Sequence, residues 1–110
     1  MYISGGRSPE YLRLNKSVLN IMHYAMNFSL PVAAICHGPQ ILAAAGVIKD
    51  RKLTGYFTVQ PEVEMAGGLW VTAADDEAVV DGNLITAATW MGHPAILRHF
   101  ITQTGISIIH

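Results

Sequence analysis

The alternation of apolar and polar stretches predicts short strands and helices in turn from the start of the chain. Residues 1–4 have the character of a strand stub that ends at the Gly5-Gly6 turn. Ser8 is a typical helix cap, Pro9 suits the first helical position, and Glu10 is an acid in the first turn. A short helical segment is therefore expected directly after the Gly5-Gly6 turn.

A longer helix and a buried strand follow. Asn15 is the expected cap of this helix, whose apolar residues recur at helical spacing on one face, namely Val18, Leu19, Met22, Ala25 and Met26. Residues 31–35 are apolar throughout, as is typical of a buried strand, and residues 38–45 predict a helix that Gly46 ends. The order strand, helix, strand, helix favours an α/β fold with a parallel sheet.

The second half of the chain predicts shorter elements. We expect a strand at residues 53–56, a helix at 61–66 that Gly67-Gly68 ends, and a strand at 69–71. Residues 78–80 and 84–87 predict a hairpin, because the intervening Asp81-Gly82-Asn83 tolerates the positive backbone angles of a tight turn. A final amphipathic helix over residues 94–102 is built on Leu97, Phe100 and Ile101, with Gly105 beyond its end. No repeat or linker divides residues 1–110.

Composition narrows the class of protein. The chain has 110 residues, of which 51% are hydrophobic and 14% charged, so a single core-rich domain is expected rather than a disordered segment. A net charge of −1 without runs of Lys or Arg argues against nucleic acid or an anionic membrane as a partner. No apolar stretch approaches the roughly 20 residues that cross a bilayer, and the N-terminus lacks a signal-peptide pattern. These features predict a soluble, cytoplasmic protein, and its single cysteine fits a reducing compartment.

Cys36 is the candidate for chemistry because it lies where the strand at residues 31–35 ends and the next helix begins. Such a turn is typical of a nucleophile elbow, which lifts one side chain above the sheet and aims the following amides at its target. The small residues Ala34 and Gly38 on either side suit a crowded turn. The helix dipole favours a thiolate at this position. The alternative is a buried cysteine that packs as a small hydrophobe, and spacing alone leaves both open.

The remaining candidates each have a structural alternative. His93 precedes the last helix, where it either lines a pocket or decorates the helix start. His23, His99 and His110 have no metal-ligand spacing with one another or with Cys36, so no metal site is expected. Four aromatic residues are expected in the core or at an interface rather than stacked on a cofactor. They are Tyr56, Phe57, Trp70 and Trp90.

Three segments together carry a resemblance to a known family. They are residues 5–13, Gly-Gly-Arg-Ser-Pro-Glu-Tyr-Leu-Arg; residues 31–40, with the Ala-Ile-Cys-His-Gly-Pro-Gln elbow; and residues 81–87, Asp-Gly-Asn-Leu-Ile-Thr-Ala. Jointly they resemble the ThiJ/PfpI superfamily of class I glutamine amidotransferase-like proteins, and its PfpI-like branch in particular. Residues 90–94 look most like the plant members, which often have tandem domains. The resemblance covers essentially the whole chain.

The resemblance implies a flavodoxin-like α/β sandwich with a mainly parallel sheet and a catalytic site without a cofactor. Cys36 would be the nucleophile and His37 its acid/base partner, while the backbone amides of Gly6 and His37 would form an oxyanion hole. Glu10 matches the acid that reaches the histidine of a neighbouring subunit in PfpI-like oligomers, where it would orient the imidazole. From the residues alone, Glu10 is a first-turn acid that stabilises its helix, and His37 is equally a base or a packed histidine.

The function implied is that of a cysteine-dependent glyoxalase or deglycase acting on small reactive carbonyls, such as the conversion of methylglyoxal to lactate. The alternatives are a PfpI-like cysteine peptidase or amidase using the same thiol, and a non-catalytic stress-response or interaction protein. The partners implied are therefore a small carbonyl substrate and further copies of the chain, with the site shared between subunits.

Family members carry further strands before the Gly-Gly turn, together with an acidic residue that hydrogen-bonds the sulfur. The resemblance therefore implies a partial domain that lacks these N-terminal strands. We expect the elbow strand to lack at least one neighbour and the isolated chain to oligomerise or aggregate through exposed edges and apolar faces. Tyr11, Leu12 and Leu14, close to Glu10, are the candidates for an oligomer contact.

Overall fold

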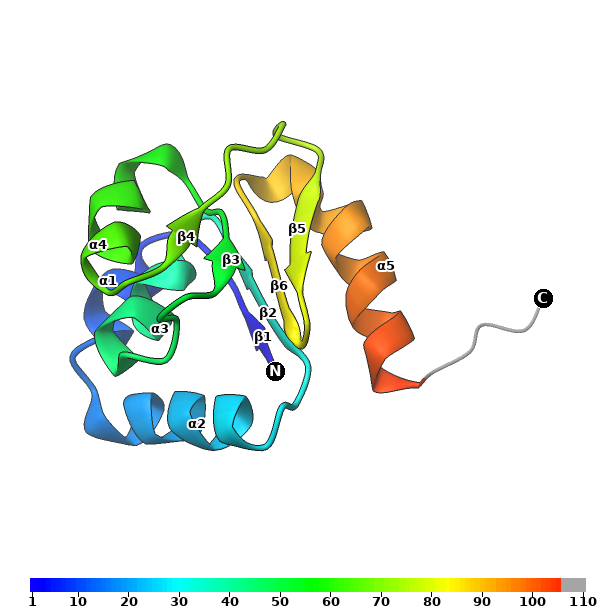
Figure 1. The fold of residues 1–110 in the computed structure, drawn as a ribbon. Helices are drawn as coiled ribbons and strands as arrows, with labels where there is room; N and C mark the ends of the chain where they lie inside the picture. The colour runs from blue at the N-terminus through cyan, green and yellow to red at the C-terminus, as the bar shows by residue number, and fades with distance from the viewer. Residues whose placement is uncertain (106–110) are drawn as a thin grey trace.

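A central sheet of four strands organises the chain in the computed structural model, which describes residues 1–105. The strands are β1 (Tyr2–Ile3), β2 (Val32–Ile35), β5 (Ala78–Asp81) and β6 (Leu84–Ala87), and their order in the sheet is β1-β2-β6-β5. β2 runs parallel to both β1 and β6, while β5 is antiparallel to β6 (Figure 1). The predicted α/β fold with a mainly parallel sheet is confirmed, as is the hairpin, in which Gly82 has φ +57°.

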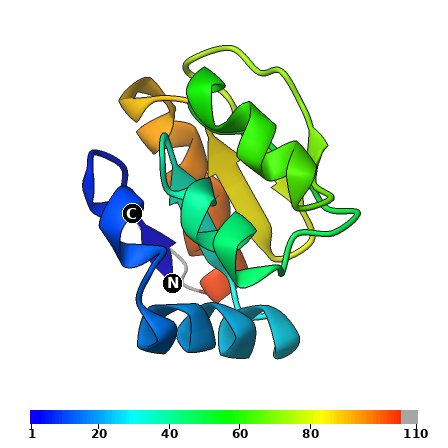
Figure 2. The same ribbon diagram turned by 90° about the vertical axis from the view of Figure 1, so that its left-hand side faces the viewer.

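Helices cover both faces of this sheet. They are α1 (Ser8–Leu12), α2 (Lys16–Asn27), α3 (Pro39–Ala45), α4 (Gln60–Met65) and α5 (His93–Thr104), with short 3₁₀ turns at Phe57–Val59 and Trp90–Gly92. α5 lies alone on one side, and the other helices lie on the opposite side (Figures 1 and 2). Alternate residues of β2 supply the two cores: Val32 and Ala34 pack beneath α2 and α3, and Ala33 and Ile35 pack with Ile96 of α5.

The prediction that the elbow strand lacks a neighbour is wrong. β2 is paired along both edges, with Ala33 in register with Tyr2 of β1 and with Ile85 of β6. All four residues of β2 are buried, and its uninterrupted apolar run follows from the packing of helices on both faces of the sheet. Within the described residues the edge strand on this side of the sheet is β1, so the elbow itself has full backbone support.

The middle of the chain forms a second, smaller sheet that the pattern did not predict. β3 (Lys52–Leu53) and β4 (Leu69–Trp70) pair in parallel. Both are shorter than the strands expected at residues 53–56 and 69–71. Side chains of the hairpin attach this sheet to the main one. The Asp81 carboxylate accepts from the backbone N–H of Lys52 at 2.7 Å, and the Thr86 hydroxyl accepts from the N–H of Thr54 at 2.8 Å.

The helix ends and faces agree with the sequence in part, and the main differences lie at the start of α1 and in α5. Asn15 caps α2 as predicted, its side chain accepting from the Val18 N–H at 3.2 Å. Ser8 does not cap α1, because the cap position is Arg7 and no side chain fills that role. The apolar face of α5 is set by Ile96, which is fully buried, whereas the predicted Leu97 is 42% exposed. α5 also begins one residue early, at His93.

Among residues 1–105, no helix combines the length and the apolar character that a membrane crossing requires.

Candidate active site

Cys36 occupies a tight turn between β2 and α3, as the elbow prediction requires. Its φ of +59° is in the left-handed region, which a residue with a side chain enters only at a cost. The Cys36 N–H donates to the Ala87 carbonyl of β6 at 3.0 Å, and the Gly38 N–H donates to the Ile35 carbonyl at 2.8 Å. The pairing of β2 with β6 thus continues into the turn and holds Cys36 in its strained conformation.

Glycines make room for this turn. A Cβ on Gly5 would lie 2.7 Å from the Cβ of Cys36, and a Cβ on Gly38 would lie 3.0 Å from the carbonyl oxygens of Ile3 and Ile35. The first distance is shorter than real Cβ contacts, and the second is tight enough that the backbone around Gly38 would have to shift. The loop after β1 and the start of α3 can therefore approach the cysteine closely only because these residues are glycines.

Cys36 and His37 face one another. The Cys36 Sγ lies 3.3 Å from the His37 Nδ1. The His37 ring stacks on the ring of Tyr56, with 5.1 Å between centroids and 29° between planes. Tyr56 is further tied to the elbow because its N–H donates to the Cys36 carbonyl at 2.8 Å. Sequence analysis did not connect Tyr56 with the site, and its position directly after Gly55, shortly beyond the end of β3, was the only available signal.

The thiol opens into a pocket of about 370 Å³. Its lining residues are Ser4, Gly5, Gly6, Ile35, Cys36, Trp90 and His93. His93 begins α5 and also lines this pocket, so the two positions that the sequence offered for it, at a helix start and in a pocket, occur together. The Tyr2 hydroxyl hydrogen-bonds to His93 Nδ1, and the two rings stack nearly in parallel at 5.8 Å. Burial raises the pKa of the Tyr2 phenol above its ordinary value of 10.0, so the hydroxyl carries its proton well beyond neutral pH.

The two backbone amides assigned to an oxyanion hole are free to donate. Gly6 has φ +77° and borders the thiol pocket, and His37 follows the cysteine directly. Among residues 1–105, neither the Gly6 nor the His37 N–H donates to a backbone carbonyl. Unpaired amides next to a nucleophile are the donors that stabilise negative charge on a bound oxygen.

Glu10 lies near His37 without engaging it. Both residues line a second hollow of about 500 Å³, beside Arg13 and Glu62. The Glu10 carboxylate is half exposed, and its nearest cation is Arg7, at 3.9 Å. No hydrogen bond joins Glu10 to His37 among the described residues.

A different acid, Glu62, makes side-chain hydrogen bonds among the residues that line this hollow. The Glu62 carboxylate accepts from Arg13 at 3.3 Å and from the Gln40 Nε2 at 3.1 Å. This leaves the Gln40 Oε1 buried without a hydrogen-bond partner. Sequence analysis missed this polar group because its members come from three separate segments, namely α3, α4 and the residue directly after α1.

Of the aromatic residues expected in the core or at an interface, only Trp70 packs against the core, and an interface role for the others stays a prediction. Trp90 is 73% exposed, Phe57 is 70% exposed, and Tyr56 and Trp70 are partly buried at the rims of pockets. In the part of the chain that the structure describes, no group of three His, Cys, Asp or Glu side chains is arranged to hold a metal ion. His110, one of the histidines considered for such a group, lies outside the described residues.

Comparison with known proteins assigns the chain to a family. The model of the DJ-1/PfpI family matches residues 1–103. "Protein DJ-1 homolog D" of Arabidopsis thaliana is 50% identical over 109 residues, which cover 98% of this chain and 28% of the relative. "Deglycase PfpI" of Pyrococcus furiosus is 41% identical over 105 residues, which cover 92% of this chain and 59% of the relative.

The fold leads to the same family. A crystal structure from Anabaena variabilis, of a two-domain protein with DJ-1/ThiJ/PfpI-like and ferritin-like domains, matches with a TM-score of 0.87 and 30% identity. The match covers 94% of this chain and 29% of that one. The chain therefore spans well under two thirds of the length of these relatives. With the family model matching nearly its whole length, the chain belongs to the DJ-1/PfpI family.

Proposed function

We propose that the chain carries the site of a cysteine-dependent enzyme that converts small reactive carbonyl compounds, with a glyoxalase or deglycase type of chemistry. The observation that carries the proposal is the 3.3 Å contact between Cys36 Sγ and His37 Nδ1 on a strained turn that opens into a pocket. A thiol beside an imidazole is the arrangement that activates a cysteine nucleophile.

In the proposed reaction the Cys36 thiolate adds to the aldehyde carbon of methylglyoxal. The C–S bond forms, and the carbonyl electron pair moves to oxygen, where the amides of Gly6 and His37 would stabilise it. A base then takes the proton from the former aldehyde carbon and returns a proton to the neighbouring carbon, which is reduced as the first is oxidised. Water hydrolyses the resulting thioester, releasing lactate and the thiol. His37 is the proposed base because its ring is the imidazole nearest the sulfur.

The names of relatives support carbonyl chemistry. "Deglycase PfpI" of Pyrococcus furiosus and "Protein/nucleic acid deglycase 2" of Escherichia coli are 41% and 38% identical to this chain. Each is longer than the chain, so the activity of those whole proteins enters here as part of the proposal.

We further propose that Glu10 acts across an interface between two copies of the chain. Within one chain Glu10 borders the same hollow as His37, yet its carboxylate is exposed and makes no bond to the imidazole. Tyr11, Leu12 and Leu14, directly after Glu10, are exposed large hydrophobic residues, as an interface at α1 requires. In such an assembly Glu10 would orient the His37 of the other copy.

A non-catalytic interaction role is the second candidate function. One observation favours it: β1 has one partner strand among the described residues, and α2 exposes Ile21 and Tyr24, with Phe28 just after its end. An open strand edge beside apolar side chains suits association with another chain.

Lactate formation from methylglyoxal separates the two candidates. The proposal expects the purified chain to form lactate and the Cys36→Ala variant to form none above the uncatalysed rate. Equal rates of lactate formation by the two proteins would rule out the enzymatic proposal and favour the interaction role. Release of a peptide or amide product by the same thiol, without lactate, would instead indicate acyl transfer.

A further inference from the structure

The thiol pocket is lined by an imidazole other than that of His37. His93 borders the pocket together with Cys36, whereas His37 lines the hollow that also includes Glu10. The two imidazoles come from different elements, because His37 follows the elbow cysteine and His93 begins α5. The proposed reaction uses His37 as its base and gives His93 no part.

Aromatic packing fixes the His93 ring at the pocket. The Tyr2 ring stacks on it nearly in parallel, and the Phe100 ring meets the Tyr2 ring edge-on with 6.0 Å between centroids. His93 and Tyr2 are both partly buried. The other polar side chains of the lining, apart from the thiol, are those of Ser4 and Trp90, and both are exposed. His93 is therefore the polar group of this lining that the surrounding protein holds in place.

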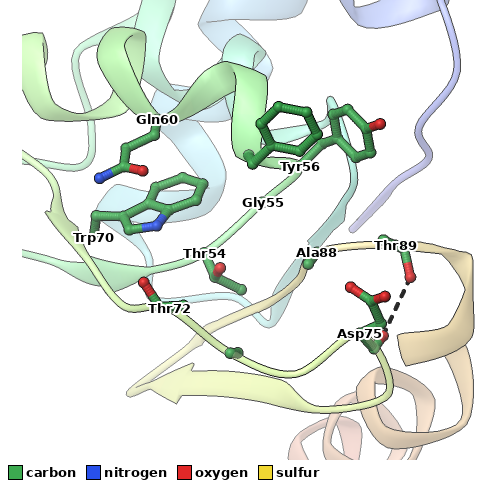
Figure 3. Close-up of a pocket in the computed structure, with 11 residues that line it drawn as sticks. Thr54, Gly55, Tyr56, Gln60, Trp70, Thr72, Asp75, Ala88 and Thr89 are labelled. Carbon is green, nitrogen blue, oxygen red and sulfur yellow. Dashed lines mark hydrogen bonds between the residues drawn. The ribbon is translucent and has the colours of Figure 1, made fainter.

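The backbone that leads to His93 is held as well. The Thr89 hydroxyl donates to the Asp75 carbonyl at 3.3 Å, which is the dashed line in Figure 3. A Cβ on Gly92 would lie 2.6 Å from the Cβ of Ala87, so the start of α5 can approach the end of β6 only because residue 92 is a glycine. A donor that is already in position can stabilise charge without a cost of reorganisation.

The Tyr2 hydroxyl decides which nitrogen of the His93 ring carries hydrogen. Among residues 1–105, Nδ1 of His93 is the only hydrogen-bond partner of this hydroxyl. Because burial raises the pKa of the Tyr2 phenol, the hydroxyl keeps its hydrogen and donates it to Nδ1. A neutral imidazole has one acceptor and one donor nitrogen, so Nδ1 as the acceptor places the hydrogen on Nε2. Nε2 has no partner within the described residues, which leaves its N–H available to a ligand in the pocket.

We infer that His93 is a further catalytic residue, whose Nε2–H donates a hydrogen bond to the ketone oxygen of a carbonyl compound attached to Cys36. In the hemithioacetal of methylglyoxal, this oxygen belongs to the carbon next to the one bonded to sulfur. The amides of Gly6 and His37 are proposed to hold the former aldehyde oxygen, so different groups hold the two oxygens. The catalytic role rests on the proposed function, but the hydrogen bond to a ketone in this pocket does not.

The hydrogen bond from His93 acts during the proton transfer. When the base takes the proton from the carbon bonded to sulfur, the C–H electron pair forms a double bond to the next carbon, and the ketone electron pair moves onto its oxygen. The Nε2–H stabilises the negative charge that develops there, which a neutral imidazole is able to do. The base then returns the proton to the second carbon. The hydroxyl proton of the first carbon passes to the former ketone oxygen as the thioester carbonyl forms.

Alkylation of Cys36 with chloroacetone places such a ketone in the pocket without any catalysis. The C–S bond forms as chloride leaves, and the acetonyl group carries its ketone oxygen on the same atom as the hemithioacetal does. With the ketone carbon isotopically labelled, its NMR frequency in the folded chain, compared with the same adduct unfolded in denaturant, reports hydrogen bonding to the oxygen. Intact mass and the Cys36→Ala protein establish that the label is on the thiol.

Three variants locate the donor. His93→Gln keeps an N–H donor, His93→Leu has none, and His99→Leu is the matched control at an exposed histidine of α5. We expect folding to move the ketone signal to higher frequency, as a hydrogen bond to the oxygen does. His93→Leu should lose this displacement, His93→Gln should keep part of it, and His99→Leu should keep all of it.

Nitrogen NMR of the unmodified wild-type chain tests the inference without a variant, and it should show hydrogen on Nε2 of His93 and none on Nδ1. A ketone signal that stays at its unfolded frequency, an equal displacement in His93→Leu, or hydrogen on Nδ1 alone would overturn the inference. A folded chain whose thiol chloroacetone cannot reach would overturn it too.

Lactate formation from methylglyoxal tests the catalytic role. In an active chain, His93→Leu should lower kcat about 100-fold with little change in KM, because the donor acts on charge that develops in the transition state. His93→Gln should recover part of this loss. An unchanged kcat in His93→Leu would overturn the catalytic role. A wild-type chain that forms no lactate refutes the proposed function, and the ketone signal then still decides whether His93 donates in this pocket.

Discussion

The Cys36 Sγ and the His37 Nδ1 lie 3.3 Å apart although the two residues are adjacent in sequence. In a continuing strand they would point to opposite faces of the sheet. The φ of +59° at Cys36 turns the chain there and brings both side chains to the same site. The strained backbone is thus what makes a neighbouring pair of residues a possible thiol and base.

This strain predicts an unusual order of stability for two variants. Cys36→Gly should be more stable than Cys36→Ala by about 1 kcal/mol, because glycine adopts positive φ without steric cost. Chemical denaturation of both proteins measures the difference. Ala34→Gly, two residues earlier in β2, is the control and should destabilise the chain. A Cys36→Ala protein as stable as Cys36→Gly would show that the turn is not strained.

Gly5 should not tolerate a side chain. In Gly5→Ala the new Cβ would meet the Cys36 Cβ at 2.7 Å, so the loop or the elbow must shift. We expect a loss of about 1–3 kcal/mol of unfolding free energy, together with slower alkylation of Cys36. Ser4→Ala, at the preceding exposed position, should have little effect on stability. Wild-type stability and thiol reactivity in Gly5→Ala would contradict the described contact.

Asp81 should make stability depend on acid pH. The Lys52 N–H, and then the Arg51 guanidinium, hold the pKa of this carboxyl below its ordinary value of 3.8. A carboxyl with a lowered pKa in the folded state adds stability above its unfolded pKa, and this stability is lost as the pH falls through the folded value.

Asp81→Asn should therefore lower the melting temperature at pH 7 and flatten its decline below about pH 4. Thermal melts across pH 2–7 measure this, with the exposed Asp76→Asn as the control. Parallel curves for the wild type and Asp81→Asn would disprove the linkage.

The Tyr2 hydroxyl should contribute both to stability and to the position of His93. Tyr2→Phe keeps the ring packed on His93 and Phe100 but removes the hydrogen bond to His93 Nδ1. We expect a loss of about 0.5–1.5 kcal/mol in unfolding free energy and a change in the NMR signals of the His93 ring. Tyr11→Phe, at an exposed tyrosine, is the matched control. Equal stabilities of the two Phe variants would count against a role for the Tyr2–His93 bond.

The local signals in the sequence predicted the elements around the thiol well. The apolar run ending at Cys36, the Asn15 cap and the Asp81-Gly82 turn each specify a backbone conformation within a few residues. Such short-range chemistry is visible in a sequence without knowledge of the fold. The elbow and its neighbouring glycines could therefore be predicted.

Contacts between distant segments could not be predicted in the same way. Tyr56 meets His37, and Tyr2 meets His93, through the packing of segments that lie far apart in the sequence. The exposed Leu97 has the spacing of a core residue, and packing against β2 and β6 selects Ile96 instead. The pairing of β2 along both edges could not be predicted either, because one of its partners, β1, is a strand of only two residues.

The central claim is that Cys36 is an activated nucleophile, and the rate of its alkylation by iodoacetamide at pH 7 tests it most directly. Because Cys36 is the only cysteine in the chain, intact-mass spectrometry reports this residue alone. We predict that the folded chain reacts at least about tenfold faster than the same chain unfolded in denaturant, and that His37→Asn removes most of this advantage. Slower alkylation in the folded chain than in the unfolded one would show that Cys36 is a structural thiol and contradict the proposed mechanism.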